Sequence, residues 1–166
     1  MRPSASELID SIAEALDTRV APHVTDPWAA STLRSIRGLL AHLSVRLDME
    51  IPMLTASNAD LRALLSNARA TLASTSTSRI LHAQDLDGVL ARPWRLPDEM
   101  PTSASLDEEN RALNEGLEQL VRLLHDDAGA IDEGSRTALL GEIREYFGRQ
   151  REREAPLWAV FSGPSF

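Results

Sequence analysis

The sequence predicts an all-α protein, an up-and-down bundle of four or five helices with one long irregular connection at about residues 74–105. Leucine and isoleucine recur at intervals of three and four residues over most of the chain, which is the period of a helix face. Serine, asparagine and aspartate precede these stretches as candidate N-caps, and prolines bound them. No stretch alternates apolar and polar residues as a strand does. At 166 residues, the chain is expected to form one domain, 1–166.

The first helix is predicted over residues 6–20. Ser4 and Glu7 have the spacing of a capping box, in which each side chain accepts a hydrogen bond from the other's backbone. Pro22 is expected to end the helix. The apolar face comprises Ile9, Ile12, Leu16 and Val20.

The second and third helices are predicted on either side of Pro52. The second begins at residues 26–27, an aspartate cap followed by proline, and should stop or kink at Pro52. The third follows a candidate cap at residues 57–60 and ends near Ala73. The second helix carries an unbroken apolar stripe of Leu33, Ile36, Leu40, Leu43 and Leu47, and the third carries Leu61, Leu64, Leu65, Ala68 and Leu72.

The segment at about 74–105 lacks this pattern. Residues 74–78 are all serine or threonine, which compete for backbone hydrogen bonds. Residues 79–91 can form a short helix, and prolines then follow at positions 93, 97 and 101. A connection this long is expected to pack on the bundle, to be disordered or to have a function.

The last two helices are predicted at residues 105–125 and 132–154. Ser105 and Glu108 have capping-box spacing, and Pro156 is expected to end the second of these helices. The stripe of the first is Leu106, Leu113, Leu117, Leu120 and Leu124. The expected buried residues of the second are Leu139, Ile143, Tyr146 and Phe147.

Composition excludes several classes of function. The chain has no cysteine, which excludes disulfides, a thiol nucleophile and thiolate metal sites. It has no lysine, which excludes a P-loop and Schiff-base chemistry. The net charge of −8 argues against nucleic-acid binding. No apolar run is long enough to span a membrane, and no secretory signal is recognisable, so a cytoplasmic protein without membrane contact is expected.

The histidines do not form a recognisable metal motif. The Glu-x-x-His pairs of di-iron bundles do not occur, and the four histidines are spread over separate elements. An alternative is a metal-dependent enzyme, in which three of the histidines come together in the fold and bind one metal ion. No cofactor is expected from the sequence.

Two sets of polar residues are candidates for ligand binding. The first is a cleft at the end of the second helix, lined by His42, Arg46, Glu50 and Trp94 and roofed by residues 79–100, in which Arg46 and Glu50 should pair at i, i+4.

The second set is Asn110 and Gln150, which interrupt two apolar stripes and should meet in one layer of an antiparallel pair. That layer is either a structural amide pair that sets the register or the polar floor of a ligand pocket.

The C-terminal stretch is a candidate interface. Leu157, Trp158 and Phe161 follow Pro156, and apolar side chains of this size are costly to leave in water. The stretch should therefore fold back on its own bundle or pack against another chain across a two-fold axis.

Residues 33–54, 110–124 and 143–158 resemble a group of small bacterial helical-bundle proteins with no assigned activity. Members of this group are often encoded beside aminoglycoside-phosphotransferase-like kinases and acyl-CoA dehydrogenases. The resemblance implies an accessory role near acyl-CoA or phosphotransfer metabolism, and it transfers no functional residue.

The sequence therefore favours a non-enzymatic protein that acts as a homodimer or through a protein partner. A small-molecule or acyl-chain binder with a pocket under residues 79–100 is the main alternative.

Overall fold

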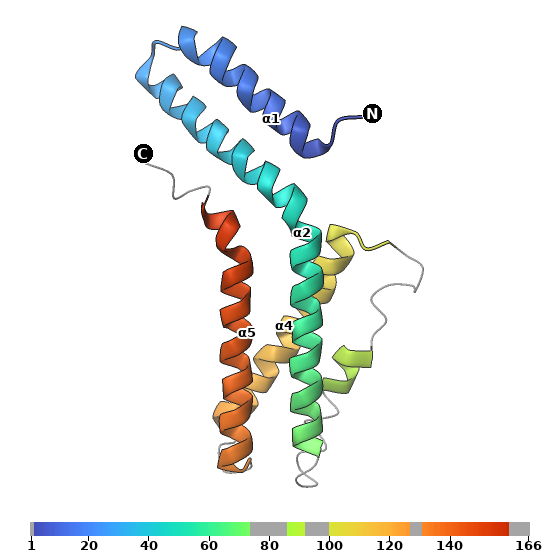
Figure 1. Ribbon diagram of the computed structural model, residues 1–166. Helices are drawn as coiled ribbons and strands as arrows, with labels where there is room; N and C mark the ends of the chain where they lie inside the picture. The colour runs from blue at the N-terminus through green and yellow to red at the C-terminus, as the bar shows by residue number, and fades with distance from the viewer. Residues whose placement is uncertain (1, 74–85, 92–99, 127–130, 160–166) are drawn as a thin grey trace. The chain divides into compact units, whose positions relative to one another are not determined.

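The computed structural model describes the chain except residues 1, 74–85, 92–99, 127–130 and 160–166 (Figure 1). The described residues are almost all helical and include no strand, which confirms the all-α helical bundle. Among them, no helix is both long and apolar enough to cross a membrane.

The first helix, α1, spans Ala5–Ala15 and begins at the predicted capping box. The backbone N–H of Glu7 donates to Ser4 Oγ at 3.1 Å, and the backbone N–H of Ser4 donates to Glu7 Oε2 at 2.7 Å. A π-helical turn, η1 (Leu16–Val20), and a 3-10 turn, η2 (Ala21–His23), complete the segment. The predicted range is therefore helical, but its last turn is widened before Pro22.

The second helix, α2, runs without interruption from Pro27 to Ala73. The prediction that Pro52 separates two helices is wrong, and so are the predicted link and the predicted cap at residues 57–60. A proline inside a helix removes one hydrogen bond and costs about 3 kcal/mol. The helix continues because the residues after Pro52 are held by packing: Ser57 and Asn58 are buried instead of capping a new helix.

The remaining long helices are α4 (Ser103–Asp126) and α5 (Glu133–Ala159), and residues 86–91 form a short helical segment. Thr102 caps α4, because the backbone N–H of Ser105 donates to Thr102 Oγ1 at 3.1 Å, so the predicted Ser105 cap is wrong by one turn. Pro156 lies inside α5 and does not end it.

The chain divides into two compact units. Unit 1 consists of Met1–Glu50 and Arg153–Phe166, and unit 2 of Ile51–Glu152. Helices α2 and α5 each contribute to both. The prediction of a single domain stays a prediction.

Unit 2 contains the hydrophobic core, to which α2, α4, α5 and the segment 86–91 all contribute. The leucine stripe predicted for α4 is buried throughout, as are Leu139, Ile143 and Tyr146 of α5. Phe147 is 55% exposed, so its predicted burial is wrong. The adjacent Tyr146 occupies the core position, and a helix turns the next side chain away by 100°.

Gly116 allows α4 to approach α2 and the segment 86–91 closely. A Cβ atom added there would lie 3.2 Å from Leu65 Cδ1 and 3.7 Å from Val89 Cγ1. Gly141 of α5 is also helical, but a Cβ atom added there would meet nothing within 4 Å. Substitutions at the two glycines can therefore distinguish the effect of close packing on stability, which applies at Gly116, from the effect of helix propensity, which applies at both.

We expect Gly116→Val to lower the free energy of unfolding by about 1–3 kcal/mol, as overpacking does. Gly141→Ala should raise it by about 0.5–1 kcal/mol, because alanine loses less backbone entropy in a helix. Urea unfolding of both variants measures the difference. Equal stabilisation by the two substitutions would show that α4 does not approach its neighbours closely at Gly116.

Candidate functional site

The predicted cleft at the end of the second helix is only partly described. Arg46 Nε lies 2.6 Å from Glu50 Oε2, which confirms the expected i, i+4 pair. His42 and Glu50 are half-buried. Trp94 and most of the predicted roof, residues 79–100, lie outside the described residues, so the cleft stays a prediction.

Asn110 and Gln150 meet as the sequence predicts, and a third residue joins them. Asn110 Nδ2 donates to Ser57 Oγ at 3.2 Å, and Gln150 Nε2 donates to the same oxygen at 2.8 Å. Tyr146 Oη lies 3.3 Å from Ser57 Oγ. Helices α2, α4 and α5 are therefore joined at one buried hydroxyl.

The adjacent Asn58 extends this cluster. It donates from Nδ2 to the Leu106 carbonyl oxygen at 2.9 Å and accepts from Asn110 Nδ2 at 2.7 Å. The amides thus bond to protein groups, as buried polar groups must to avoid a large desolvation cost. This geometry supports the structural interpretation, in which the amides fix the register of the three helices. Sequence reasoning missed Ser57 and Asn58 because both were assigned to a helix cap.

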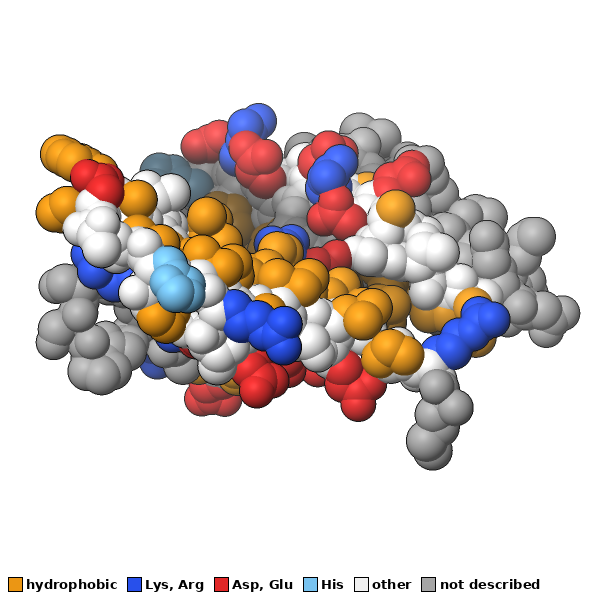
Figure 2. All heavy atoms as spheres, turned by 90° about the horizontal axis from the view of Figure 1, so that it is seen from above, with side chains coloured by type: hydrophobic (Ala, Val, Ile, Leu, Met, Phe, Trp, Pro, Cys, Tyr) orange, Lys and Arg blue, Asp and Glu red, His pale blue; other side chains and the backbone are white. Residues whose placement is uncertain are grey.

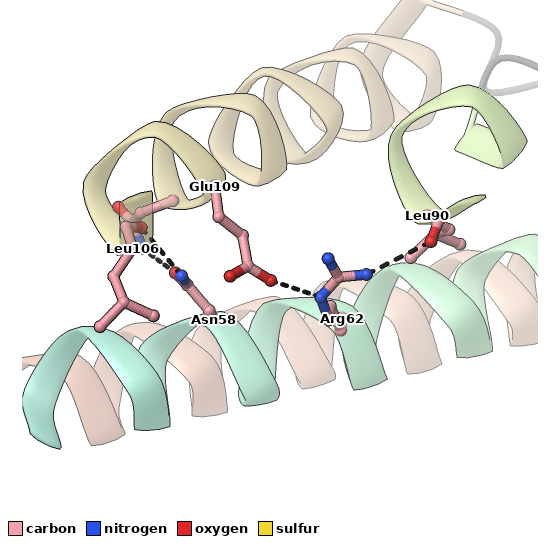
Figure 3. Close-up of polar contacts among 6 residues, drawn as sticks. Asn58, Arg62, Leu90, Leu106 and Glu109 are labelled. Carbon is pink, nitrogen blue, oxygen red and sulfur yellow. Dashed lines mark hydrogen bonds and ion pairs between the residues drawn. The ribbon is translucent and has the colours of Figure 1, made fainter. Parts of the chain in front are cut away.

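A second polar contact joins α2, α4 and the segment 86–91 (Figure 3). Arg62 Nε donates to Glu109 Oε1 at 2.6 Å, and Arg62 Nη1 donates to the Leu90 carbonyl oxygen at 3.3 Å. The Glu109 side chain is only 10% exposed, against 32% for Arg62. The guanidinium of Arg62 therefore neutralises the charge of a buried carboxylate. It also donates a hydrogen bond to a backbone carbonyl near the end of the short helical segment.

The same segment is held at its other end by Arg69, which pairs with Asp87. The hydrogen bond from Arg69 and the charge of Asp87 raise the pKa of the guanidinium. Leu86 is buried, and Val89 and Leu90 pack on the core. These contacts give the segment a structural role in unit 2.

No group of three or more histidine, aspartate or glutamate side chains in the described part of the chain is arranged to hold a metal ion.

Unit 1 differs from unit 2 in that none of its described residues, 2–50 and 153–158, is buried. The stripe predicted to form the core side of the second helix is therefore only partly covered: Leu33 and Leu40 are half-buried, whereas Ile36, Leu43 and Leu47 are exposed. Six large apolar side chains, each between 42 and 56% exposed, form what we term the uncovered face: Leu8, Ile12, Ile36, Leu39, Leu43 and Leu47. Hydrophobic side chains gather in a band on the side of the molecule that Figure 2 shows.

The six residues lie on one side of the hairpin that α1 forms with the first half of α2. On α1, the half-buried Ile9, Ala13 and Leu16 mark the side toward α2, and Leu8 and Ile12 lie a quarter turn from it. On α2, the half-buried Ala30, Leu33 and Leu40 mark the side toward α1. The four exposed residues of α2 lie a quarter turn away in the same rotational sense. Because the helices are antiparallel, both rows reach the same side of the hairpin.

Charged residues of α1 lie on the opposite side of the hairpin. Glu7, Asp10 and Glu14 follow one another at three and four residues and so share one line on the helix. Asp17 continues this line and pairs with Arg37 of α2. Helix α1 therefore carries its acidic line and its apolar row on different sides.

The predicted interface at the C-terminus is partly described. Leu157 and Trp158 lie within α5, not beyond it, and Trp158 is 63% exposed. Phe161 is outside the described residues. The role of this stretch as an interface stays a prediction.

No protein-family model matches this chain, and neither a curated protein nor a solved structure matches it. The resemblance drawn from the sequence therefore stays a prediction.

Proposed function

We propose that this protein acts by binding, not by catalysis, and that the uncovered face of its hairpin binds a second copy of the chain. The observation that carries the proposal is a difference between the two halves of α2. The 3-4 spacing of its apolar stripe runs through both halves. In unit 2, Leu61, Leu64 and Ala68 of this stripe are buried, whereas Ile36, Leu43 and Leu47 in unit 1 are exposed.

A half-exposed aliphatic side chain gains roughly 1 kcal/mol when its burial is completed. Contiguous apolar patches of more than a few hundred Å² on a protein surface mark interaction sites. The uncovered face groups six exposed apolar side chains in two adjacent rows on one side of a hairpin. This favours a partner that brings its own apolar rows.

A second hairpin of the same kind supplies the two helices that unit 1 lacks. Two hairpins packed face to face make a four-helix bundle, in which all the apolar rows point inward. With 1.5 Å per residue and helices about 10 Å wide, residues 5–23 and the matching length of α2 present roughly 600 Å² of projected face, of which the uncovered face occupies part. Side-chain area exceeds this projection, so the contact approaches the ~800 Å² per partner of stable interfaces.

Charge also favours self-association through this face. The acidic line of α1 lies on the other side of the hairpin, so two copies can meet without bringing Glu7, Asp10 and Glu14 together. The nearest charges on α2, Arg46 and Glu50, already neutralise each other at 2.6 Å. Interface cores are depleted in charge in the same way.

Light scattering coupled to gel filtration tests the proposal. The natural chain should elute as a dimer at micromolar concentration. The double variant Leu39→Glu with Leu43→Glu should elute as a monomer, because dimerisation would bury four carboxylates without partners. Its far-UV circular dichroism should stay helical, since both side chains are exposed in the single chain.

The control is Val121→Glu, which places one carboxylate per chain on a 40% exposed apolar position of α4 in unit 2. This variant should remain a dimer. A natural chain that is monomeric at all accessible concentrations would overturn the proposal, as would a double variant that stays dimeric.

A further inference from the structure

The uncovered face also indicates how two copies would be arranged, an inference that rests on the proposed function. A two-fold axis allows two ways of stacking one hairpin face on another. In the first, α2 lies on the partner's α2 and α1 on the partner's α1, each in opposite directions. In the second, α1 of each copy lies on α2 of the other, with both turns at the same end.

The two rows of the uncovered face differ in length. On α2 the row runs from Ile36 to Leu47 and contains four residues, whereas on α1 it contains only Leu8 and Ile12. Stacking like on like pairs a row of four with a row of four and a row of two with a row of two. The apolar side chains of one helix can then pack between those of the other helix, as knobs into holes, over the full length of both rows.

The crossed arrangement leaves the longer row incompletely covered. At equal distances from the turn at residues 24–26, Ile36 lies level with Glu14, and Leu47 lies level with Pro3. One end of the α2 row would then lie beside a turn of α1 that carries an acidic residue, and the other end would lie beyond Ala5, the first residue of α1. The side chains at these ends would lose the van der Waals contacts that a leucine of the partner would make with them.

The heights of the rows meet the requirement of a single axis. The middle of the α1 row is about 15 residues from the turn, and the middle of the α2 row is about 16 residues from it, which is nearly the same height at 1.5 Å per residue. One two-fold axis that lies parallel to the face and perpendicular to both helix axes can therefore bisect both rows at once.

From these matches we infer that two copies associate with their α2 helices antiparallel and in contact, about a two-fold axis that passes between Leu39 and Leu43. Leu39 of each copy then lies opposite Leu43 of the other. The partner's turn lies at the opposite end of the four-helix bundle, and no residue of unit 2 is required for the contact.

The chain is a convenient background for a test, because it contains no cysteine. A Leu39→Cys chain is mixed with a Leu43→Cys chain of different tag length, the dimers are allowed to exchange, and disulfides are formed with oxidised glutathione. The mixed disulfide should form on the order of tenfold faster than the homodimer of Ile36→Cys, because bridging requires Cα atoms within about 7 Å. In this arrangement the two Ile36 positions lie far from the axis on opposite sides.

The second mixture, Leu8→Cys with Leu43→Cys, probes the crossed arrangement, in which these two positions lie level. Rapid cross-linking of this pair in place of the first would overturn the inference and leave the proposed self-association standing. Dimers by light scattering with no cross-link in either mixture would also overturn it, since the copies would then meet elsewhere. A natural chain that is monomeric by light scattering would overturn both.

Discussion

Leu117→Ala is expected to lower the free energy of unfolding by about 2–5 kcal/mol, the cost of deleting a buried leucine side chain and leaving a cavity. Leu117 lies on α4 at 4% exposure, in the core shared with α2 and α5. Urea unfolding followed by circular dichroism measures the change. An effect of this size would remove a large part of the stability of a domain this long.

Leu39→Ala is the matched control, since the same atoms are deleted from a side chain that is 56% exposed. At protein concentrations low enough to give a monomer, its effect should stay below about 1 kcal/mol. Similar losses for the two variants would mean that the assignment of the core to unit 2 is wrong.

Arg62→Met should be the second most damaging substitution, with a loss of about 2–3 kcal/mol. It leaves the Glu109 carboxylate, 10% exposed, without its counter-charge and the Leu90 carbonyl without its donor. The cost is placed below the 3–5 kcal/mol of a fully buried pair because about a third of Arg62 is exposed. Adding Glu109→Leu should restore most of the loss, because no buried charge then remains.

The control for this pair is Arg122→Met. Arg122 Nη2 lies 2.5 Å from Glu118 Oε1, but both side chains are well exposed. Surface pairs of this kind contribute less than about 1 kcal/mol, so the control should unfold at nearly the natural urea concentration. A loss from Arg62→Met that the added Glu109→Leu does not relieve would show that Arg62 acts through packing and not through its charge.

The leucine stripe of α4 and three of the four residues predicted to be buried on α5 lie in the core, because other helices of unit 2 cover both faces. The capping box at Ser4 is equally predictable, since its hydrogen bonds involve only residues one turn apart. The meeting of Asn110 and Gln150 follows from the register of an antiparallel pair. In each of these cases, local spacing is sufficient to determine the outcome.

Pro52 misleads the prediction because the cost of a proline in a helix is local, whereas the packing that outweighs it comes from α4 and α5. The same error explains why Ser57 was missed: the sequence pattern predicts that it caps a helix, whereas in the fold it lies at the centre of a polar cluster. The stripe from Leu33 to Leu47 predicts a helix correctly but cannot tell whether its partner belongs to the same chain. Spacing determines which side is apolar, and tertiary structure determines what covers it.

The prolines also bear on the cooperativity of unfolding. Unit 2 is inserted between the two segments of unit 1, so the chain passes from one unit to the other twice, once in α2 and once in α5. Pro52 and Pro156 each lie within a turn of one passage, and each leaves a carbonyl four residues earlier, at Asp48 and Glu152, without its helical N–H donor. Helical order propagates along a chain through such consecutive hydrogen bonds. Both covalent routes between the units therefore lack a helical hydrogen bond near the boundary, and we expect the helical order of unit 1 to be lost before the core of unit 2 unfolds.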